Sequence, residues 1–394
     1  MHPNKYSDAA RTKAMEALFS EVNNDDGLDW PSSFEERFLT VSKQKYAVAV
    51  NSGTSGLHVA LMALGVGPGD EVISPALTVI MDTFATLYVG ATPVFADVLQ
   101  DTWNIDPASV EALITPRTKA IISVSWFGLP ADLVSLRRIA DKYGIALIDD
   151  SAETILVGDY QPNKASAPDI RVFSFESKKH LSTGGEGGMV TTDSADLAKR
   201  IRQAGGLGYR HLSAMKGRTS LAARTFQSPE YMRFDAIGFN YRMTPVTAAI
   251  GIGQLEDLPE KLQARLDCST AFSNAITGCS WLIPQSTPEG LVHSYYSFGI
   301  LYDGEAQKGV TWQEFYDRYA EKGGDGYYAN CSNPYLEPVF KGKHFGVQKC
   351  EFGLAPVAEL LQKNIMAFKT NYLDMERLAE NAKILGELID EIGR

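Results

Sequence analysis

Short runs of β-branched and other apolar residues alternate with helix-length stretches over the first half of the chain. The helix-length stretches are amphipathic, as in SGLHVALMAL, DPASVEALI and ADLVSLRRIADKYG. Alternation of this kind predicts an α/β fold with a mainly parallel, seven-stranded sheet and helices on both faces. The apolar runs that predict the strands are 47–50, 71–74, 92–98, 119–126, 144–150, 171–175 and 187–192.

The pattern changes in the second half of the chain. A long helical pattern begins near Tyr241, and a strand-like segment, SWLIPQSTPEGLVHSYYSFGILYDG, follows Cys279. Residues 323–346 are rich in Gly, Tyr and Asn, and the chain closes with the helical pattern MERLAENAKILGELIDEIG. We therefore predict two domains, a large domain with an N-terminal segment over 1–255 and a smaller C-terminal α/β domain over 256–394.

Composition narrows the classes of partner. The chain has 394 residues, of which 44% are hydrophobic, and this is enough for a large core. Its 37 basic and 48 acidic residues give a net charge of −11, so no basic surplus is present to neutralise nucleic-acid phosphates or an anionic membrane.

The compartment is predicted from cysteine spacing and from the apolar stretches. The four cysteines show no C-x-x-C spacing, which favours free thiols in a reducing cytosol. The N-terminal stretch lacks the apolar core of a signal peptide, and the longest apolar stretch, 74–96, is interrupted by Asp82 and Pro93. We expect a cytoplasmic protein without a membrane span.

The residues just after each apolar run are the candidates for chemistry, because ligands of parallel sheets bind beyond the carboxyl ends of the strands. In NSGTSGLHVAL, Gly53 permits a tight turn, and Thr54 and Ser55 stand where a helix begins. Backbone N–H groups, hydroxyls and the helix dipole suit a phosphate there, although a simple helix N-cap explains the same residues. The chain has no G-x-x-x-x-G-K-[ST] or G-x-G-x-x-G motif, which argues against a nucleoside triphosphate or dinucleotide site.

Two acids and two lysines follow later runs. Asp149 and Asp150 point to opposite faces of a strand, so only one of them can enter a given site; helix capping explains them as well. The six histidines show no metal-ligand spacing. Ser174 lies at another strand end, and Lys178 and Lys179 follow in a loop. A phosphate cradle, an acid and an amine at one sheet edge suit pyridoxal phosphate, whose ring nitrogen needs the acid and whose aldehyde needs the lysine.

Five motifs in order carry a resemblance to a known family. They are NSGTSGLHVALMALGVGPGDEVI, NIDPASVEALITPRTKAII, LIDDSAE, FSFESKKHLSTGGEGGMV and GFNYRMTPVTAAIGIGQLEDL. With them the chain resembles the pyridoxal-phosphate-dependent sugar aminotransferases of the DegT/DnrJ/EryC1/StrS family, which have the fold type I (aspartate aminotransferase) architecture. The likeness extends from 34–38 to 356–372. One such motif is a weak signal, but five in the right order are a strong one.

The resemblance implies which residues bind the cofactor. Thr54 and Ser55 would hold its phosphate, with help from Ser174. Asp150 would pair with the ring nitrogen, and Glu153 stands where the family usually has a glutamine near the ring.

It also implies contributions from other segments. Asn240 would reach the phosphate from a neighbouring subunit, which makes a homodimer the minimum functional unit, and Arg242 would lie near the same interface as a candidate for substrate binding. Two positions depart from the family pattern: Val79 replaces an aromatic residue that stacks on the cofactor, and Ser125 replaces a frequent histidine.

Two residues compete for the Schiff-base position. Counting forward from Phe173 gives Lys179, whereas counting back from Glu186 gives His180, and an extra glycine at 184–185 explains the difference. We predict Lys179, because the covalent bond needs a primary amine and a glycine-rich turn absorbs an insertion more easily than a strand end. His180 then stays a candidate for substrate binding.

The resemblance implies a transamination with Lys179 and Asp150 as catalytic residues and L-glutamate as the amino donor. The acceptor would be a nucleotide-linked 4-keto sugar or C8 of a 3,8-dideoxy-octulosonate, for lipopolysaccharide or a related surface polysaccharide. One alternative is a keto-sugar 3-dehydratase that uses His180. Another is a non-enzymatic regulatory protein that binds pyridoxal phosphate.

Overall fold

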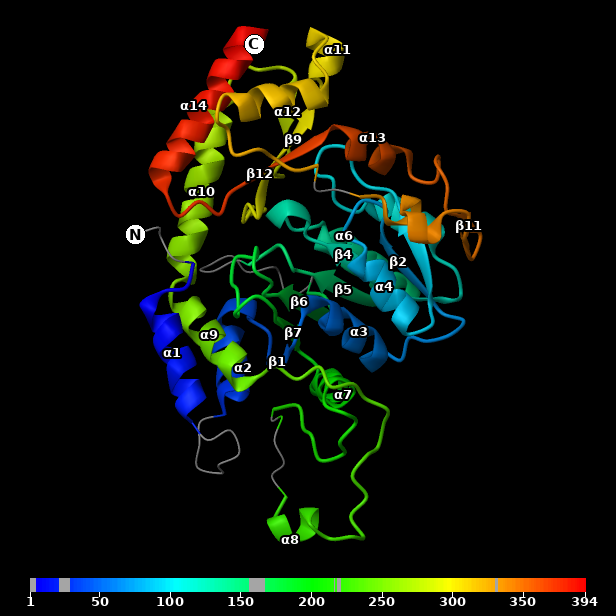
Figure 1. The fold of residues 1–394 in the computed structure, drawn as a ribbon. Coiled ribbons are helices and arrows are strands. Elements are labelled where there is room, and N and C mark those ends of the chain that lie inside the picture. The colour runs from blue at the N-terminus through cyan, green and yellow to red at the C-terminus, as the bar shows by residue number, and fades with distance from the viewer. Residues whose placement is uncertain (1–4, 21–28, 156–166, 216, 218–220, 330–331) are drawn as a thin grey trace.

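A seven-stranded sheet forms the centre of the computed structural model, which describes residues 5–20, 29–155, 167–215, 217, 221–329 and 332–394 (Figure 1). The strand order is β1-β7-β6-β5-β4-β2-β3. Strand β7 is antiparallel to both of its neighbours, and the other pairs are parallel. The predicted α/β fold with a mainly parallel, seven-stranded sheet is therefore confirmed. The strands are β1 (Tyr46–Val50), β2 (Glu71–Pro75), β3 (Thr92–Ala96), β4 (Thr118–Val124), β5 (Ala146–Asp150), β6 (Ile170–Ser174) and β7 (Gly188–Thr192).

Helices cover both faces of this sheet because successive strand residues point to opposite sides. On one face, Val50 and Ile122 pack with apolar residues of α3 (Gly53–Ala63), α4 (Met81–Tyr88) and α7 (Ala195–Gly205). On the other face, Ala49 packs with α1, α2 and α9, and Ile121 packs with α5 and α6. The helices of this second face are α1 (Asp8–Phe19), α2 (Trp30–Ser42), α5 (Pro107–Leu113), α6 (Leu133–Tyr143) and α9 (Pro245–Glu256).

A second core lies around a three-stranded antiparallel sheet of order β12-β9-β8. Trp281, Phe272 and Phe315 are fully buried in it. Two long helices, α10 and α14, lie side by side along this sheet (Figure 1). Its elements are β8 (Leu282–Pro284), β9 (Ser297–Tyr302), β12 (Ile365–Lys369), α10 (Leu258–Ala275), α11 (Gly304–Lys308), α12 (Trp312–Glu321) and α14 (Met375–Ile392).

Part of the C-terminal third returns to the large sheet. The side-chain amide of Gln348 accepts a hydrogen bond from the N–H of Phe95 (2.8 Å) and donates one to its carbonyl oxygen (2.9 Å). These bonds satisfy backbone groups of edge strand β3, and Tyr335 packs on the same phenylalanine. The predicted domain boundary, after residue 255, lies at the end of α9 and remains a prediction. The elements of this segment are β10 (His344–Phe345), β11 (Gln348–Lys349) and α13 (Pro356–Asn364).

The segment that contains the short helix α8 (Ala223–Phe226) extends away from the sheet beyond α7 (Figure 1). No helix within the described ranges is both long and apolar enough to cross a membrane.

Candidate active site

The carboxyl ends of β1, β5 and β6 lie at one edge of the sheet, because these three strands run in the same direction. The first turn of α3 meets the end of β6 there. A side chain at Gly53 would place its Cβ 2.9 Å from the Cβ of Ser174, so only glycine fits this approach. The structure thus brings together two strand ends that the sequence predicts to hold a phosphate.

The N-terminus of α3 combines a cap with free donors. Ser52 is the N-cap and forms a capping box with Ser55: each residue's N–H donates to the other's hydroxyl at 3.1 Å. The Ser55 hydroxyl also donates to Asn51 Oδ1 at 2.7 Å, so it serves the cap. Within the described residues, the N–H groups of Gly53 and Thr54 and the Thr54 hydroxyl have no hydrogen-bond partner. Three donors are therefore available to an anion.

The two acids at the end of β5 point to opposite faces of the strand, as predicted. Asp149 accepts hydrogen bonds from the hydroxyls of Ser123 (3.2 Å) and Ser151 (2.7 Å) and lies 3.4 Å from Arg171. These contacts hold Asp149 in a structural network away from the lysine loop.

Asp150 faces the lysine loop with fewer partners. It is 3% exposed, and its Oδ1 accepts a hydrogen bond from the N–H of Ala152 at 2.9 Å. Burial raises the pKa of Asp150 to about 7, although the Ala152 hydrogen bond and the charge of Lys179 oppose the rise. A buried carboxyl group in this state is stabilised by a cationic partner.

The two adjacent lysines lie in different environments. Lys178 is exposed and stacks over the Tyr328 ring at 5.6 Å. The amine of Lys179 points inward, 3.2 Å from Glu153 Oε1 and 4.4 Å from the centre of the Tyr296 ring. Burial by itself lowers the pKa of Lys179, but Glu153, Tyr296 and Asp150 outweigh burial and raise it above its ordinary value. Lys179 is the amine that shares a buried site with the acids.

Glu153 is held in place from the opposite side. Its Oε2 accepts a hydrogen bond from the N–H of Phe127 at 3.0 Å. Phe127 has a φ of 56°, a left-handed conformation that costs a non-glycine residue free energy and is common at functional sites. The loop after β4 thus aims a backbone donor at the acid that contacts Lys179.

His180 does not share this environment. Its ring is fully buried, and Nε2 lies 3.0 Å from the carbonyl oxygen of Ser294. Burial, with a smaller effect from the charge of Arg265, lowers the pKa of His180 well below its ordinary value, so the ring is neutral at physiological pH. The histidine is therefore a buried, neutral group within the lysine loop.

The loop between β6 and β7 closes with glycines in unusual conformations. Gly184, Gly185 and Gly187 have φ values of 93°, 119° and 156°. A Cβ at Gly187 would lie 2.1 Å from Thr183 Oγ1, so no other residue fits. The N–H of Phe175 donates to the carbonyl of Gly187 at 2.8 Å and ties the two ends of the loop together.

Arg265 of α10 connects the second core to the lysine loop. Its guanidinium group donates to the Tyr296 carbonyl (2.8 Å), the Thr370 hydroxyl (2.7 Å) and the Lys178 carbonyl (3.2 Å). Burial lowers the pKa of Arg265 to about 10, which still leaves the group charged at neutral pH. One side chain therefore fixes the backbone next to both Lys179 and the Tyr296 ring.

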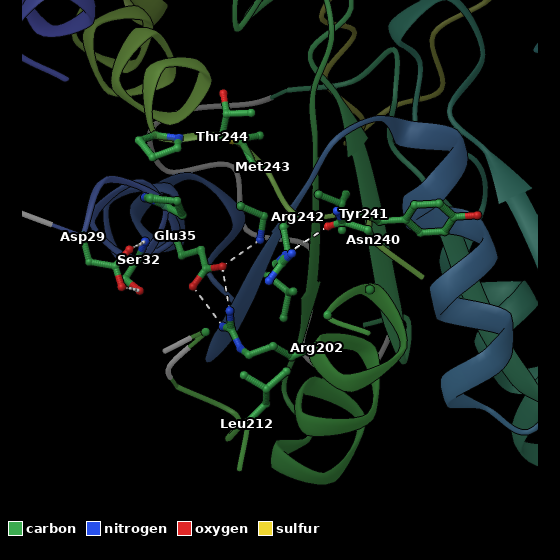
Figure 2. Close-up of a pocket in the computed structure, with 18 residues that line it drawn as sticks. Asp29, Ser32, Glu35, Arg202, Leu212, Asn240, Tyr241, Arg242, Met243 and Thr244 are labelled. Carbon is green, nitrogen blue, oxygen red and sulfur yellow. Dashed lines mark hydrogen bonds and ion pairs between the residues drawn. The ribbon is translucent and has the colours of Figure 1, made fainter. Parts of the chain in front are cut away.

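Asn240 and Arg242 lie elsewhere, at a cavity of about 520 Å³ bordered by α2, β1 and α7. Figure 2 shows Arg242 pointing toward Asn240, whose Oδ1 accepts a hydrogen bond from Arg242 Nε at 3.0 Å. Across the described residues, no hydrogen bond or ion pair joins either side chain to Lys179. The same cavity contains a buried ion pair between Glu35 and Arg202, with both bonds at 2.9 Å.

Val79 stands at the position where the sequence lacks an aromatic residue. It is half-buried and packs against the apolar cluster that contains Trp126 and Phe127. Its part in binding remains a prediction.

The set of groups fits pyridoxal phosphate. Three free donors stand at the start of α3, one amine points into the site, and a buried carboxyl group, Asp150, has no cation within ion-pair distance in the described part of the chain. Asp150 and Glu153 outnumber the single amine of Lys179, which favours a ligand with a positive ring nitrogen.

Several residues of the site were not predicted from the sequence. Tyr296, Arg265 and Ser52 contact the lysine loop or the helix cap but belong to no predicted set. Ser52 had a signal, since it stands three residues before Ser55 in the spacing of a capping box. The sequence gives no signal for Tyr296 or Arg265, because a tyrosine of a strand-like segment or an arginine of a helix looks the same whether or not it contacts a site.

Comparisons with known proteins agree with this geometry. A profile of the DegT/DnrJ/EryC1/StrS aminotransferase family matches residues 13–349. The chain is 41% identical over 232 residues to GDP-perosamine synthase of Caulobacter vibrioides, a match that covers 59% of this chain and 58% of the relative. It is 32% identical over 321 residues to the spore coat polysaccharide biosynthesis protein SpsC of Bacillus subtilis, covering 81% and 79%.

Solved structures extend the likeness to the whole chain. The aminotransferase from Psychrobacter cryohalolentis superposes with a TM-score of 0.86 at 27% identity, covering 100% of this chain and 99% of the other. A 3-amino-5-hydroxybenzoic acid synthase superposes with a TM-score of 0.82 at 26% identity, covering 99% and 100%.

Proposed function

Because the chain belongs to the DegT/DnrJ/EryC1/StrS aminotransferase family, we propose that it transfers an amino group to a carbonyl sugar with pyridoxal 5′-phosphate as its cofactor. The observation that carries this proposal is the grouping of Lys179, Glu153 and Asp150 at one sheet edge, beside free donors at the start of α3. An amine among buried acids is what this cofactor requires of its site.

We assign the binding of the cofactor to residues of the sheet edge. Thr54 and the first N–H groups of α3 hold its phosphate, with the Ser174 hydroxyl beside them. Ser55 contributes through the cap, which fixes the first turn of the helix. Asp150 would keep a proton on the ring nitrogen, and Val79 would pack against the ring with its aliphatic side chain.

Lys179 carries the proton transfer, and Glu153 supports it. When bound, the cofactor accepts negative charge from the carbon that bears the amino group. Lys179 would hold the cofactor through its aldehyde, and the neutral Nζ of Lys179 would be the base that accepts the proton of the donor's α-carbon. Glu153, 3.2 Å from this amine, orients it and stabilises its protonated form.

A nucleotide-linked 4-keto sugar is the acceptor that we favour. The support is the likeness to GDP-perosamine synthase of Caulobacter vibrioides, which is 41% identical over 232 residues. L-Glutamate is the proposed donor, and the amino sugar would serve lipopolysaccharide or another surface polysaccharide made from the cytoplasm. C8 of a 3,8-dideoxy-octulosonate is the competing acceptor.

We further propose that the working unit is a homodimer in which Asn240 enters the site of the second copy, with Arg242 next to it near the substrate. Asn240 follows a segment with exposed apolar side chains, which a second copy would bury. The exposed fractions are 71% for Met232, 57% for Phe234, 86% for Ile237 and 39% for Phe239.

Two measurements test the proposal. Borohydride reduction of the purified protein should leave the cofactor attached to Lys179, as shown by peptide mass spectrometry; attachment elsewhere would overturn the assignment. The enzyme is then incubated with ¹⁵N-labelled glutamate and a panel of 4-keto nucleotide sugars and octulosonates.

The products distinguish the competing functions. A ¹⁵N-labelled amino sugar supports transamination and identifies the acceptor carbon. A product that has lost its C3 hydroxyl and carries no label supports dehydration with His180. Cofactor binding without turnover of any compound in the panel supports a regulatory protein.

A further inference from the structure

A lone acid interrupts the most apolar long stretch of the chain. Asp82 lies in the first turn of α4, between Met81 and Thr83, and it is 0% exposed. A buried carboxyl group without a partner is costly, so its surroundings determine whether it bears a charge.

The contacts of Asp82 include one donor and no cation. Its Oδ2 accepts a hydrogen bond from the Thr78 hydroxyl at 3.1 Å. Its Oδ1 is buried and has no hydrogen-bond donor in the described part of the chain, where no ion pair of Asp82 is found either. The carboxyl group of Asp82 interacts with that of Asp150, by charge and by a side-chain hydrogen bond, and both effects raise the pKa of Asp82.

Two carboxylates in contact inside a protein do not both keep a charge, and one of them retains a proton. Asp150 has the N–H of Ala152 and the nearby ammonium group of Lys179 to stabilise its charge. Asp82 has only a neutral hydroxyl. Burial and the charge of Asp150 both raise the pKa of Asp82 well above its ordinary value, which agrees with this division.

We propose that Asp82 is a neutral carboxylic acid that donates a hydrogen bond to Asp150 and thereby positions the Asp150 carboxylate. The donor is the proton on Oδ1, the oxygen that otherwise has no partner. Asp82 is thus a positioning residue: it acts through Asp150 on the ring nitrogen of the cofactor. This role rests on the proposed function, but the protonation state of Asp82 does not.

The remaining groups around the pair are consistent with this assignment. The charge of Lys179 acts on Asp150 and opposes its protonation, Glu153 adds negative charge, and Asp149 is already paired with Arg171. None of these residues supplies a proton to Asp82 Oδ1 among the described contacts.

The first test needs no cofactor. The infrared spectrum of the apoenzyme labelled with [¹³C]aspartate, at about pH 8, should contain the C=O band of one protonated aspartate. The band should vanish in Asp82→Asn and persist in Asp149→Asn, the matched control. If the wild-type protein shows no such band, or if it vanishes only in the control, Asp82 is ionised and the proposal is wrong.

The second test measures the effect on Asp150. Asparagine keeps a donor in place of the acid, so Asp82→Asn should bind pyridoxal phosphate within about threefold of wild type. Asp82→Ala should weaken binding by roughly 10- to 100-fold, the usual effect of losing a hydrogen bond to a charged group. The pH titration of the bound cofactor's visible absorbance should shift in Asp82→Ala and return in Asp82→Asn.

The two proposals fail in different ways. If wild-type protein does not bind pyridoxal phosphate, the proposed function fails while the infrared result still stands. If wild type binds it and Asp82→Asn loses affinity as much as Asp82→Ala, the positioning role fails and the proposed function stands.

Discussion

Two buried acid–base pairs lie in helices and loops beside the large sheet, and they differ in how completely their charges are satisfied. Arg202 donates two bonds of 2.9 Å to Glu35, which also accepts the N–H of Ala49 at 2.8 Å. Lys179 makes one contact of 3.2 Å with Glu153, and Asp150 adds a further buried carboxyl group nearby.

The difference separates a structural ion pair from a reactive one. Glu35 and Arg202 satisfy each other with bidentate geometry, as is typical of a pair that joins two elements, here α2 and α7. The acids around Lys179 exceed the cations, so the site is complete only with an added positive group. Surplus buried charge, rather than burial itself, indicates the functional site.

The largest effect is expected from a variant that breaks the reactive pair of Lys179 and Glu153. Lys179→Ala should lower kcat/KM by at least about 10⁴-fold, because the group that binds the cofactor and moves the proton is removed. Steady-state transamination with glutamate measures it. Lys178→Ala is the matched control and should retain activity within about threefold, since this lysine is exposed; equal losses in both variants would contradict the assignment.

Breaking the structural pair should affect stability instead. Arg202→Ala leaves the Glu35 carboxylate buried without a cation and should lower the free energy of unfolding by about 3–5 kcal/mol. Urea denaturation measures this change. Arg200→Ala, which removes an exposed pair with Asp196, should cost at most about 0.5 kcal/mol. A small effect of Arg202→Ala would show that the two buried pairs are not different in kind.

The stability of the apoenzyme should depend on pH through Asp150. Its pKa is near 4 in the unfolded chain and about 7 in the folded one, so the unfolded state binds fewer protons between these values. The contribution of Asp150 to the free energy of unfolding should fall as pH rises from about 4 to 7, by up to about 4 kcal/mol at about 1.4 kcal/mol per unit.

A comparison of wild type with Asp150→Asn isolates the contribution of Asp150 to the free energy of unfolding. The pKa values of His180 and His293 are lowered by burial, so these histidines act in the opposite direction and must be cancelled in the difference. Urea denaturation at pH 5 and 8 should show that Asp150→Asn stabilises the apoenzyme more at pH 8. A difference independent of pH would show that Asp150 already has a cationic partner.

The smallest expected effect is that of Arg265, which supports the reactive pair from outside. Arg265→Met removes the donors to the Lys178 and Tyr296 carbonyls, and a small displacement of the loop should lower kcat by roughly 10- to 100-fold. Lys261→Met, one turn earlier on α10, is the control and should change kcat by less than about threefold. Stopped-flow single turnovers separate this loss from weaker binding of the donor.

The fold was accessible from the sequence because buried parallel strands are continuous apolar runs. Each of the seven predicted runs overlaps a strand, and the ends differ by at most two residues. The rule that ligands bind at the carboxyl ends of such strands then pointed to Ser174, Asp150 and Lys179, which the structure brings to one edge.

What the sequence did not reveal depends on contacts between distant segments. Arg265 contacts a loop 87 positions earlier in the chain, and nothing in a helix pattern predicts which carbonyl groups an arginine will meet. Asp82 is a different case, since an acid in an apolar stretch is a signal in itself. In the sequence this acid argues against a membrane span, and its isolation also indicates a buried carboxyl group with a functional role.

The loop with Lys179 leaves the sheet from β6 and re-enters it at the adjacent strand β7, closed by the hydrogen bond from Phe175 to Gly187 at 2.8 Å. A loop that connects two neighbouring strands can be replaced without a change in the path of the rest of the chain. Residues 176–186 could therefore be replaced by the corresponding loop of another aminotransferase while the strands on either side stay in place.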